Sequence, residues 1–98
     1  MSRETREVRR ISNQKGTITD KAGSSAKVRF SLIQTQDFID GMPMLKSGEG
    51  SLVFESRSDA WSMTNTPDSK TLVGGGVRAE VLVISEDSFK TTGPIVDI

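Results

Sequence analysis

The chain contains no cysteine, no histidine and no tyrosine among its 98 residues. Without cysteine there is no disulfide framework and no thiolate metal site. Without histidine the chain lacks the commonest general base and the commonest zinc ligand. These absences argue against nucleophilic catalysis of the usual kind and against a zinc site. Carboxylates, serines and glycines remain as candidates for chemistry.

These remaining candidates have an ordinary explanation as loop residues. Asp37 and Asp40 lie in a stretch with turn composition, where acidic residues are common. Neither the loop after Asp20 nor the segment Ser85–Ser88 has the spacing or ligand count of a calcium site. The triple glycine at 74–76 precedes a strand-like segment, whereas phosphate-binding glycine loops open a helix. We therefore expect no catalytic site, no metal site and no cofactor.

The length and composition describe one small folded domain. A chain of 98 residues is close to the commonest domain size. Leucine, isoleucine, valine and phenylalanine make up 24 residues and the formal net charge is zero, and both values favour folding over disorder. The first ten residues, MSRETREVRR, are charged, and no segment approaches the roughly 20 apolar residues of a membrane helix. We expect a soluble, cytoplasmic protein with no membrane partner.

The net charge of zero combines two halves of opposite sign. Residues 1–30 contain eight lysines and arginines against three acidic residues, a balance of +5. Residues 31–98 contain five against ten, a balance of −5. Such an asymmetry suits an anionic partner or head-to-tail self-association. The alternative is that strands from the two halves pair and neutralise one another, and the sequence leaves both interpretations open.

The clearest structural signal is the alternation of side chains in AKVRFSLIQT, residues 26–35. Val28, Phe30 and Leu32 fall on one face, and the opposite face begins with Lys27 and Arg29. Successive side chains of a strand point to opposite faces, so this pattern predicts a half-buried strand with a basic outer face.

Further strand-like segments bring the expected number of strands to five. A first strand is expected between Val8 and Thr19, a third at Ser51–Ser56, a fourth at Val77–Ile84 and a fifth at Pro94–Ile98. The chain lacks the crossover helices that a parallel sheet needs. The sequence therefore predicts an all-β fold, a small five-stranded antiparallel barrel of OB or related type. Its expected core is formed by Val28, Phe30, Leu32, Leu52, Phe54, Val77, Val81 and Val83.

Two segments fall outside this set of strands. Residues 1–7 hold no apolar anchor, so we expect a disordered N-terminal tail followed by one domain at residues 8–98. Residues 37–50 contain Asp40-Gly41, Pro43 and two further glycines, which indicates a loop. Since this loop is also rich in large apolar residues, we expect part of it to fold back over one end of the barrel.

The order of these features is similar to that of single-stranded-DNA-binding OB domains. A G-x-I turn occurs at Gly16–Ile18, a V-x-F-x-L strand at Val28–Leu32, and the only tryptophan follows the third expected strand. A glycine also precedes the strand that begins at Val77. Such patterns occur in many β-proteins, so they assign no family.

The function that we expect is binding of a protein partner, or self-association, without catalysis. Methionine-containing apolar surfaces adapt to different partners. The C-terminal strand is also expected to offer a free edge, to which a partner could add a strand. The competing interpretation is that the apolar loop only caps its own barrel. The residues expected at the protein interface are Phe38, Ile39, Met42, Met44 and Leu45.

The alternative function is binding of single-stranded nucleic acid, which combines a basic groove with stacking rings. Against it, alternation turns Phe30 away from Lys27 and Arg29, and the domain is neutral rather than basic. The residues expected to carry this alternative are Arg9, Arg10, Lys15, Lys27, Arg29 and Trp61.

Overall fold

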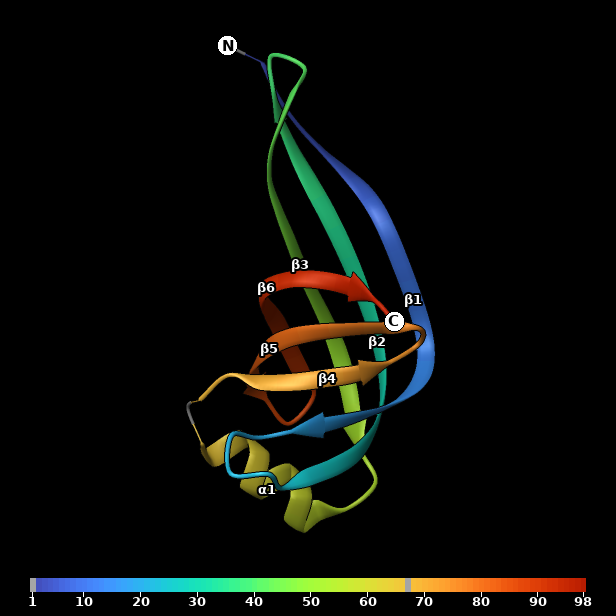
Figure 1. Ribbon diagram of the computed structural model, residues 1–98, viewed down its shortest axis with the longest axis vertical. Helices are drawn as coiled ribbons and strands as arrows, with labels where there is room; N and C mark the ends of the chain where they lie inside the picture. The colour runs from blue at the N-terminus through green and yellow to red at the C-terminus, as the bar shows by residue number, and fades with distance from the viewer. Residues whose placement is uncertain (1, 67) are drawn as a thin grey trace.

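A computed structural model, which describes residues 2–66 and 68–98, shows one antiparallel sheet and one short helix (Figure 1). The sheet closes into a ring in the order β1-β2-β3-β6-β5-β4, and β4 returns to pair with β1. The expected all-β class is confirmed, but the described residues form six strands rather than five. The elements are β1 (Arg3–Thr19), β2 (Ser25–Ile39), β3 (Met42–Phe54), α1 (Arg57–Asn65), β4 (Lys70–Gly74), β5 (Val77–Ser85) and β6 (Ser88–Asp97).

The strand missing from the sequence interpretation is β4. It has only five residues, and it is joined to β5 by Gly75 and Gly76. Both glycines have positive φ angles, 58° and 80°, which is the geometry of a two-residue hairpin turn. Gly75 and Gly76 therefore form a tight turn that folds β4 back onto β5.

The core fills the interior of the ring. Seven of the eight residues expected in the core are buried, and Phe54 is half-buried against them, so the register predicted for β2 is confirmed. The sequence interpretation missed Phe89, because the segment around it has the composition of a turn. Phe89 lies on β6 with 1% of its surface exposed, and its ring meets Phe30 edge-on at 6.5 Å between centroids. The other buried apolar residues are Ile18, Ala26, Met63, Leu72 and Ala79.

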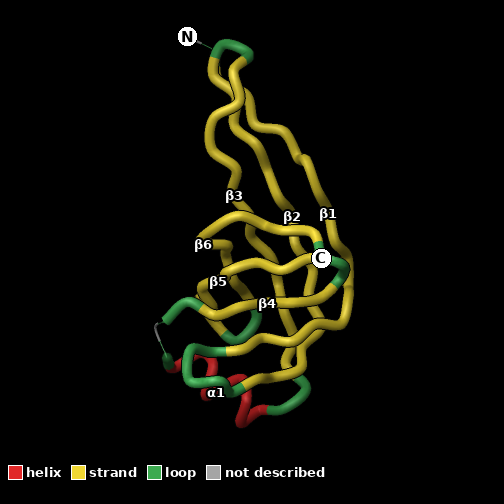
Figure 2. Tube along the Cα trace, in the orientation of Figure 1, coloured by secondary structure: helices red, strands yellow, loops and turns green. Residues whose placement is uncertain are grey.

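Three strands continue beyond the ring and form a projection, which we call the arm. The arm consists of residues 3–10 of β1, 33–39 of β2 and 42–48 of β3, and it rises from the ring opposite α1 (Figures 1 and 2). β4 joins β1 only from Gly16 onward, and β6 joins β3 only at Glu49–Ser51. The molecule is accordingly elongated, with extents of 47 × 24 × 21 Å.

The arm corrects two expectations. The expected disordered tail at residues 1–7 is a strand in the part described, because Arg3–Glu7 pair in register with β2. The expected apolar loop at residues 37–50 is a hairpin that points away from the ring. Asp40 and Gly41 have φ angles of 50° and 81°, so they form a two-residue turn that keeps β2 and β3 paired up to the tip.

A third correction concerns the C-terminal strand, which we expected to present a free edge. β6 pairs with β5 along one side and with β3 through Ser88, Phe89 and Lys90 on the other, so part of its edge is closed.

Among its described residues, the protein has no helix that is long and apolar enough to cross a membrane.

Candidate protein interface on the arm

The tip of the arm gathers the residues expected at a protein interface. Met42, Met44 and Leu45 expose 66%, 56% and 69% of their surface. Phe38 and Ile39 are half-buried on the neighbouring strand β2, and Ile39 is paired with Met42. The structure therefore brings all five residues to one end of one hairpin, and leaves the three from β3 open to solvent.

Phe38 and Ile39 belong partly to the packing of the arm itself. The guanidinium of Arg6 lies 4.9 Å from the centroid of the Phe38 ring, a cation–π contact between β1 and β2. Arg6 also forms an ion pair with Glu4 at 2.9 Å. Through these contacts the charged strand β1 covers one side of the hairpin and stiffens it.

Buried glutamines continue the inner face of β2 into the arm. Gln34 and Gln36 follow Leu32 at alternate positions, and both are buried. The Nε2 group of Gln36 donates to the carbonyl oxygens of Met44 and Asp37 at 3.0 and 3.2 Å. This side chain fastens β3 to β2 where the pairing of the two strands is irregular, between Gln36 and Phe38. The tip is therefore presented by a braced hairpin.

Asp37 is the main link between the start of β1 and the hairpin. Its carboxylate accepts hydrogen bonds from Thr5 Oγ1 at 2.8 Å and from Arg3 Nη2 at 2.9 Å. The hydrogen bond from Thr5, followed by that from Arg3, holds the pKa of Asp37 below its ordinary value of 3.8. The ionised carboxylate of Asp37 thus adds two side-chain hydrogen bonds to the backbone pairing of the first residues of β1.

The backbone edge of β3 is poorly suited to strand addition. Gly48 donates its N–H to Thr91 Oγ1 at 2.9 Å, and the same hydroxyl donates to the Gly48 carbonyl, so Gly48 faces away from β2. Alternation then directs the N–H and carbonyl of Lys46 outward as well. Nearer the tip, Pro43 has no N–H to offer. Edge lysines and prolines of this kind discourage pairing with another chain, so the tip offers side chains more than backbone.

A cleft opens beside this edge, where β3 and β6 diverge. It has a volume of about 540 Å³. Leu45, Pro94 and Ile95 give it apolar walls, and Arg9 and Gln34 also line it. Arg9 is held there by an ion pair with Asp97 at 2.8 Å. The cleft extends the apolar surface of the tip along one side of the arm.

The basic residues expected to bind nucleic acid are only partly brought together. Lys15 on β1 lies opposite Arg29 on β2, and Lys27 precedes Arg29 by two residues on the same strand. These three side chains therefore share the outer face of the ring. They form no ion pair with any other described residue. Arg10 lies further along the arm and points to the same side, where it forms an ion pair with Glu7. Arg9 points to the opposite side. The set is thus divided between two faces.

Trp61, the expected stacking ring, lies on α1 and not on the basic strands. It exposes 69% of its surface. The helix packs against β3 and β5 through its buried residue Met63. The tryptophan is therefore a solvent-exposed ring on a separate element.

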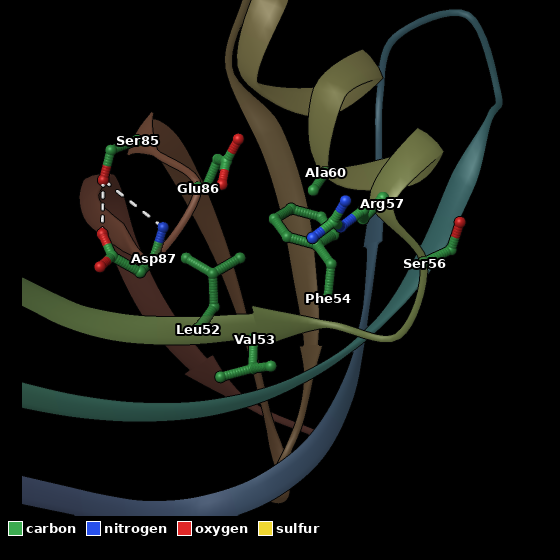
Figure 3. Close-up of a pocket in the computed structure, with 9 residues that line it drawn as sticks. All are labelled: Leu52, Val53, Phe54, Ser56, Arg57, Ala60, Ser85, Glu86 and Asp87. Atoms are coloured by element: carbon green, nitrogen blue, oxygen red, sulfur yellow. Dashed lines mark hydrogen bonds between the residues drawn. The ribbon is translucent and has the colours of Figure 1, made fainter.

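A second depression lies at the end of the ring next to α1, and Figure 3 shows its lining. Its volume is about 510 Å³. The hydroxyl of Ser85 donates to Asp87 Oδ1 at 2.8 Å and accepts from the Asp87 N–H at 3.5 Å. These bonds close the two-residue turn between β5 and β6. The carboxylate of Asp87 has a structural partner, and the chain offers no histidine to complete a catalytic pair.

Lys70 is a buried charge that the sequence interpretation missed. Only 1% of its surface is exposed, and its Nζ donates to the carbonyl oxygens of Thr66 and Asp68 at 2.8 Å each. Desolvation lowers the pKa of Lys70, and the nearby carboxylates of Asp68 and Asp20 oppose this effect. Because Thr66 is the C-cap of α1, the ammonium group ties the end of the helix to β4. Its role is structural.

The described residues contain no group of three or more acidic side chains placed to hold a metal ion.

Comparison with protein-family models, with curated proteins and with solved structures finds no match for this chain. The geometry of the arm and the ring is therefore the basis for assigning a function.

Proposed function

We propose that this protein is a non-enzymatic interaction module that binds a protein partner through the tip of the arm. The observation that carries the proposal is the exposure of Met42, Met44 and Leu45 on a braced hairpin that projects from the ring. Contiguous exposed apolar residues on a small domain mark interaction sites. The methionines favour a partner with an apolar groove, since their flexible side chains fit irregular surfaces.

The position of the tip supports this proposal over the interpretation that the apolar residues cap the domain. A capping loop would lie against one end of the ring, but the hairpin extends away from it (Figure 1). The ring already buries its own core, including Phe30, Leu32 and Phe89. The apolar tip is thus available to another molecule.

The proposal predicts that the triple variant Met42→Ser, Met44→Ser, Leu45→Ser loses its partner. A photo-crosslinking amino acid at Pro43 would first trap the partner, and the dissociation constant would then be measured with the purified protein. We expect binding to weaken at least about tenfold, because each Å² of apolar area lost from the interface costs about 25 cal/mol.

A matched control removes three exposed apolar residues from the ring, by Val53→Ser, Ile84→Ser and Val96→Ser. This control should bind the partner as the wild type does. Equal binding by the tip variant and the control would contradict the proposal, provided that both keep the circular dichroism spectrum of the wild type.

The alternative function, binding of single-stranded nucleic acid by an OB-like domain, is supported by one observation. Lys15, Lys27 and Arg29 are neighbours on the outer face and have no described ion-pair partner. Binding there would weaken steeply with salt, because neutralised phosphates release counterions. We expect oligo-dT to leave the fluorescence of Trp61 unchanged. Because Trp61 lies on α1 and the basic residues on β1 and β2, the readout of binding is the fluorescence anisotropy of a labelled oligo-dT. Salt-sensitive binding at micromolar protein, lost in the variant Lys15→Glu, Lys27→Glu, would favour the alternative.

A further inference from the structure

The outer edge of β1 is unpaired along the arm. Among the described residues, β1 pairs with β2 on one side, and β4 reaches its other side only from Gly16 onward. The side chains from Arg3 to Val8 are all exposed. This edge therefore presents free backbone groups to solvent.

The hydrogen bonding near the start of the chain shows which groups face outward. The Asp40 N–H donates to the Ser2 carbonyl at 2.8 Å, so the backbone of Ser2 faces the hairpin. Residues of an antiparallel strand alternate in the side to which their N–H and carbonyl point. Arg3, Thr5 and Glu7 consequently direct these groups away from β2.

The side chains along this edge have a symmetric pattern of charge. The segment reads Arg3-Glu4-Thr5-Arg6-Glu7, so reversing its direction about Thr5 exchanges every arginine with a glutamate. An identical strand running antiparallel, with its own Thr5 opposite Thr5, would place Arg3 opposite Glu7 and Glu4 opposite Arg6. Directly opposed charges of opposite sign stabilise a strand pair.

We propose that a second copy of this chain binds the outer edge of β1, so that the two β1 strands pair antiparallel about a twofold axis at Thr5. The outward backbone groups of Arg3, Thr5 and Glu7 then meet the same three residues of the second copy. The two three-stranded arms become one continuous sheet. The contact is isologous, because the same surface is used on both copies.

The charge pattern selects this register over its neighbours. Displacing the second strand by two residues in one direction places Arg6 opposite Arg6, and in the other direction places Glu4 opposite Glu4. A parallel arrangement in which each residue lies opposite its own copy opposes like charges at every charged position. Charged edges usually discourage pairing, but of the arrangements compared above only the register about Thr5 opposes unlike charges at every charged position from Arg3 to Glu7.

The shape of the molecule leaves room for this dimer. The arm projects from the ring (Figure 1), so an antiparallel second arm carries its own ring to the opposite end of the shared sheet. On one face, the existing Arg6–Glu4 pair would meet its symmetric equivalent and form a square of alternating charges. The inference is independent of the proposed function, since the tip belongs to β3 on the other side of the arm.

Charge exchange tests the dimer directly. An acidic-edge variant carries Arg3→Glu and Arg6→Glu, and a basic-edge variant carries Glu4→Arg and Glu7→Arg. In sedimentation equilibrium at low salt, the wild type should show a reversible monomer–dimer equilibrium, and each variant alone should stay monomeric. An equimolar mixture of the two should associate, because every opposed pair then has opposite charges. The matched control Lys21→Glu, Arg57→Glu changes the net charge equally and should dimerise as the wild type does.

The absence of native cysteine allows a second test of the register. Opposed residues of a hydrogen-bonded antiparallel pair have Cα atoms about 5.5 Å apart, within the range of a disulfide. Thr5→Cys should therefore form a disulfide-linked dimer under mild oxidation, whereas Glu7→Cys should not, since its proposed neighbour is Arg3.

Three results would overturn the inference. The first is a wild type that stays monomeric at the highest soluble concentration. The second is a mixture of folded acidic-edge and basic-edge variants that fails to associate. The third is a dimer that is lost in the Met42, Met44 and Leu45 serine variant but kept in both charge variants, because self-association would then belong to the tip and would support the proposed function instead.

Discussion

The arm and the ring are made by the same strands, yet different interactions hold them. In the ring, β2 buries Val28, Phe30 and Leu32 against strands on every side. In the arm, the same face of β2 continues with Gln34 and Gln36, and only β1 and β3 flank it. Three of the four ion pairs among the described residues lie wholly within the arm, and the fourth joins its base, through Arg9, to Asp97. The ring is held by apolar burial, and the arm by pairing, charge and a buried amide.

This difference explains why the arm is suited to binding. A three-stranded sheet with no covering layer keeps both edges and much of its apolar surface open. Closing the sheet into a ring pairs the edge strands and buries the apolar face of the sheet in the interior. The protein thus has a stable base that buries its core and a projection whose surfaces remain available.

The largest expected effect is on the free energy of unfolding, when a phenylalanine of the ring is removed and the loss is compared with that at a phenylalanine of the arm. Phe30→Ala should lower the free energy of unfolding by roughly 3–5 kcal/mol, as expected for a fully buried phenylalanine. Phe38→Ala, on the same strand in the arm, should cost no more than about half of this, since Phe38 is only half-buried. Chemical denaturation of both variants measures the difference. Similar losses at the two positions would mean that the arm shares the core of the ring.

A smaller effect is expected from removing the first segment of the arm. Deletion of residues 2–7 takes away exposed side chains and leaves the ring intact, so the thermal midpoint should fall by less than about 5 °C. The same deletion should abolish the dimer proposed above. Calorimetry gives the midpoint, and a larger drop would show that this segment is part of the cooperative unit.

The smallest effect is a loosening of the arm in acid. Because the folded pKa of Asp37 is lowered, its stabilising contribution is complete above the ordinary value of 3.8 and is lost as the pH falls through the lowered value. Hydrogen-exchange protection of the Glu4 and Arg6 amides, which face β2, should decrease in that range while protection in the ring persists. In Asp37→Asn these two amides should show reduced protection already at neutral pH. If protection in that variant were unchanged, the backbone hydrogen bonds alone would hold the start of β1 against β2, without help from the Asp37 side chain.

The ring was largely predictable from the sequence. Alternation of apolar and polar residues identified β2, the end of β3 and β5, and the buried residues named from it lie in or against the core. Such alternation is a local property, because a strand with one buried face must repeat every two residues. Phe89 and Lys70 escaped prediction because their immediate neighbours are polar, and only the strands packed around them bury these side chains.

The candidate site was predicted as a set of residues but not as a structure. Composition identified Met42, Met44 and Leu45 as an apolar group, and the turn residues Asp40-Gly41 were recognised. Whether such a segment is a loop or a hairpin depends on what pairs with it. Its support is the charged segment 3–7, whose residues give no apolar signal of a strand.

The sequence by itself determined the all-β class, the faces of the main strands and the location of the apolar segment. The tertiary structure alone decided that β4 closes the sheet, that the first residues of β1 join the hairpin, and that Arg9 and Arg10 point to opposite sides. The reason is physical. The alternation of apolar and polar residues is a local property of each strand. The closure of the sheet and the projection of the arm arise from pairing between segments far apart in the chain, and the backbone hydrogen bonds of that pairing are the same for every side chain.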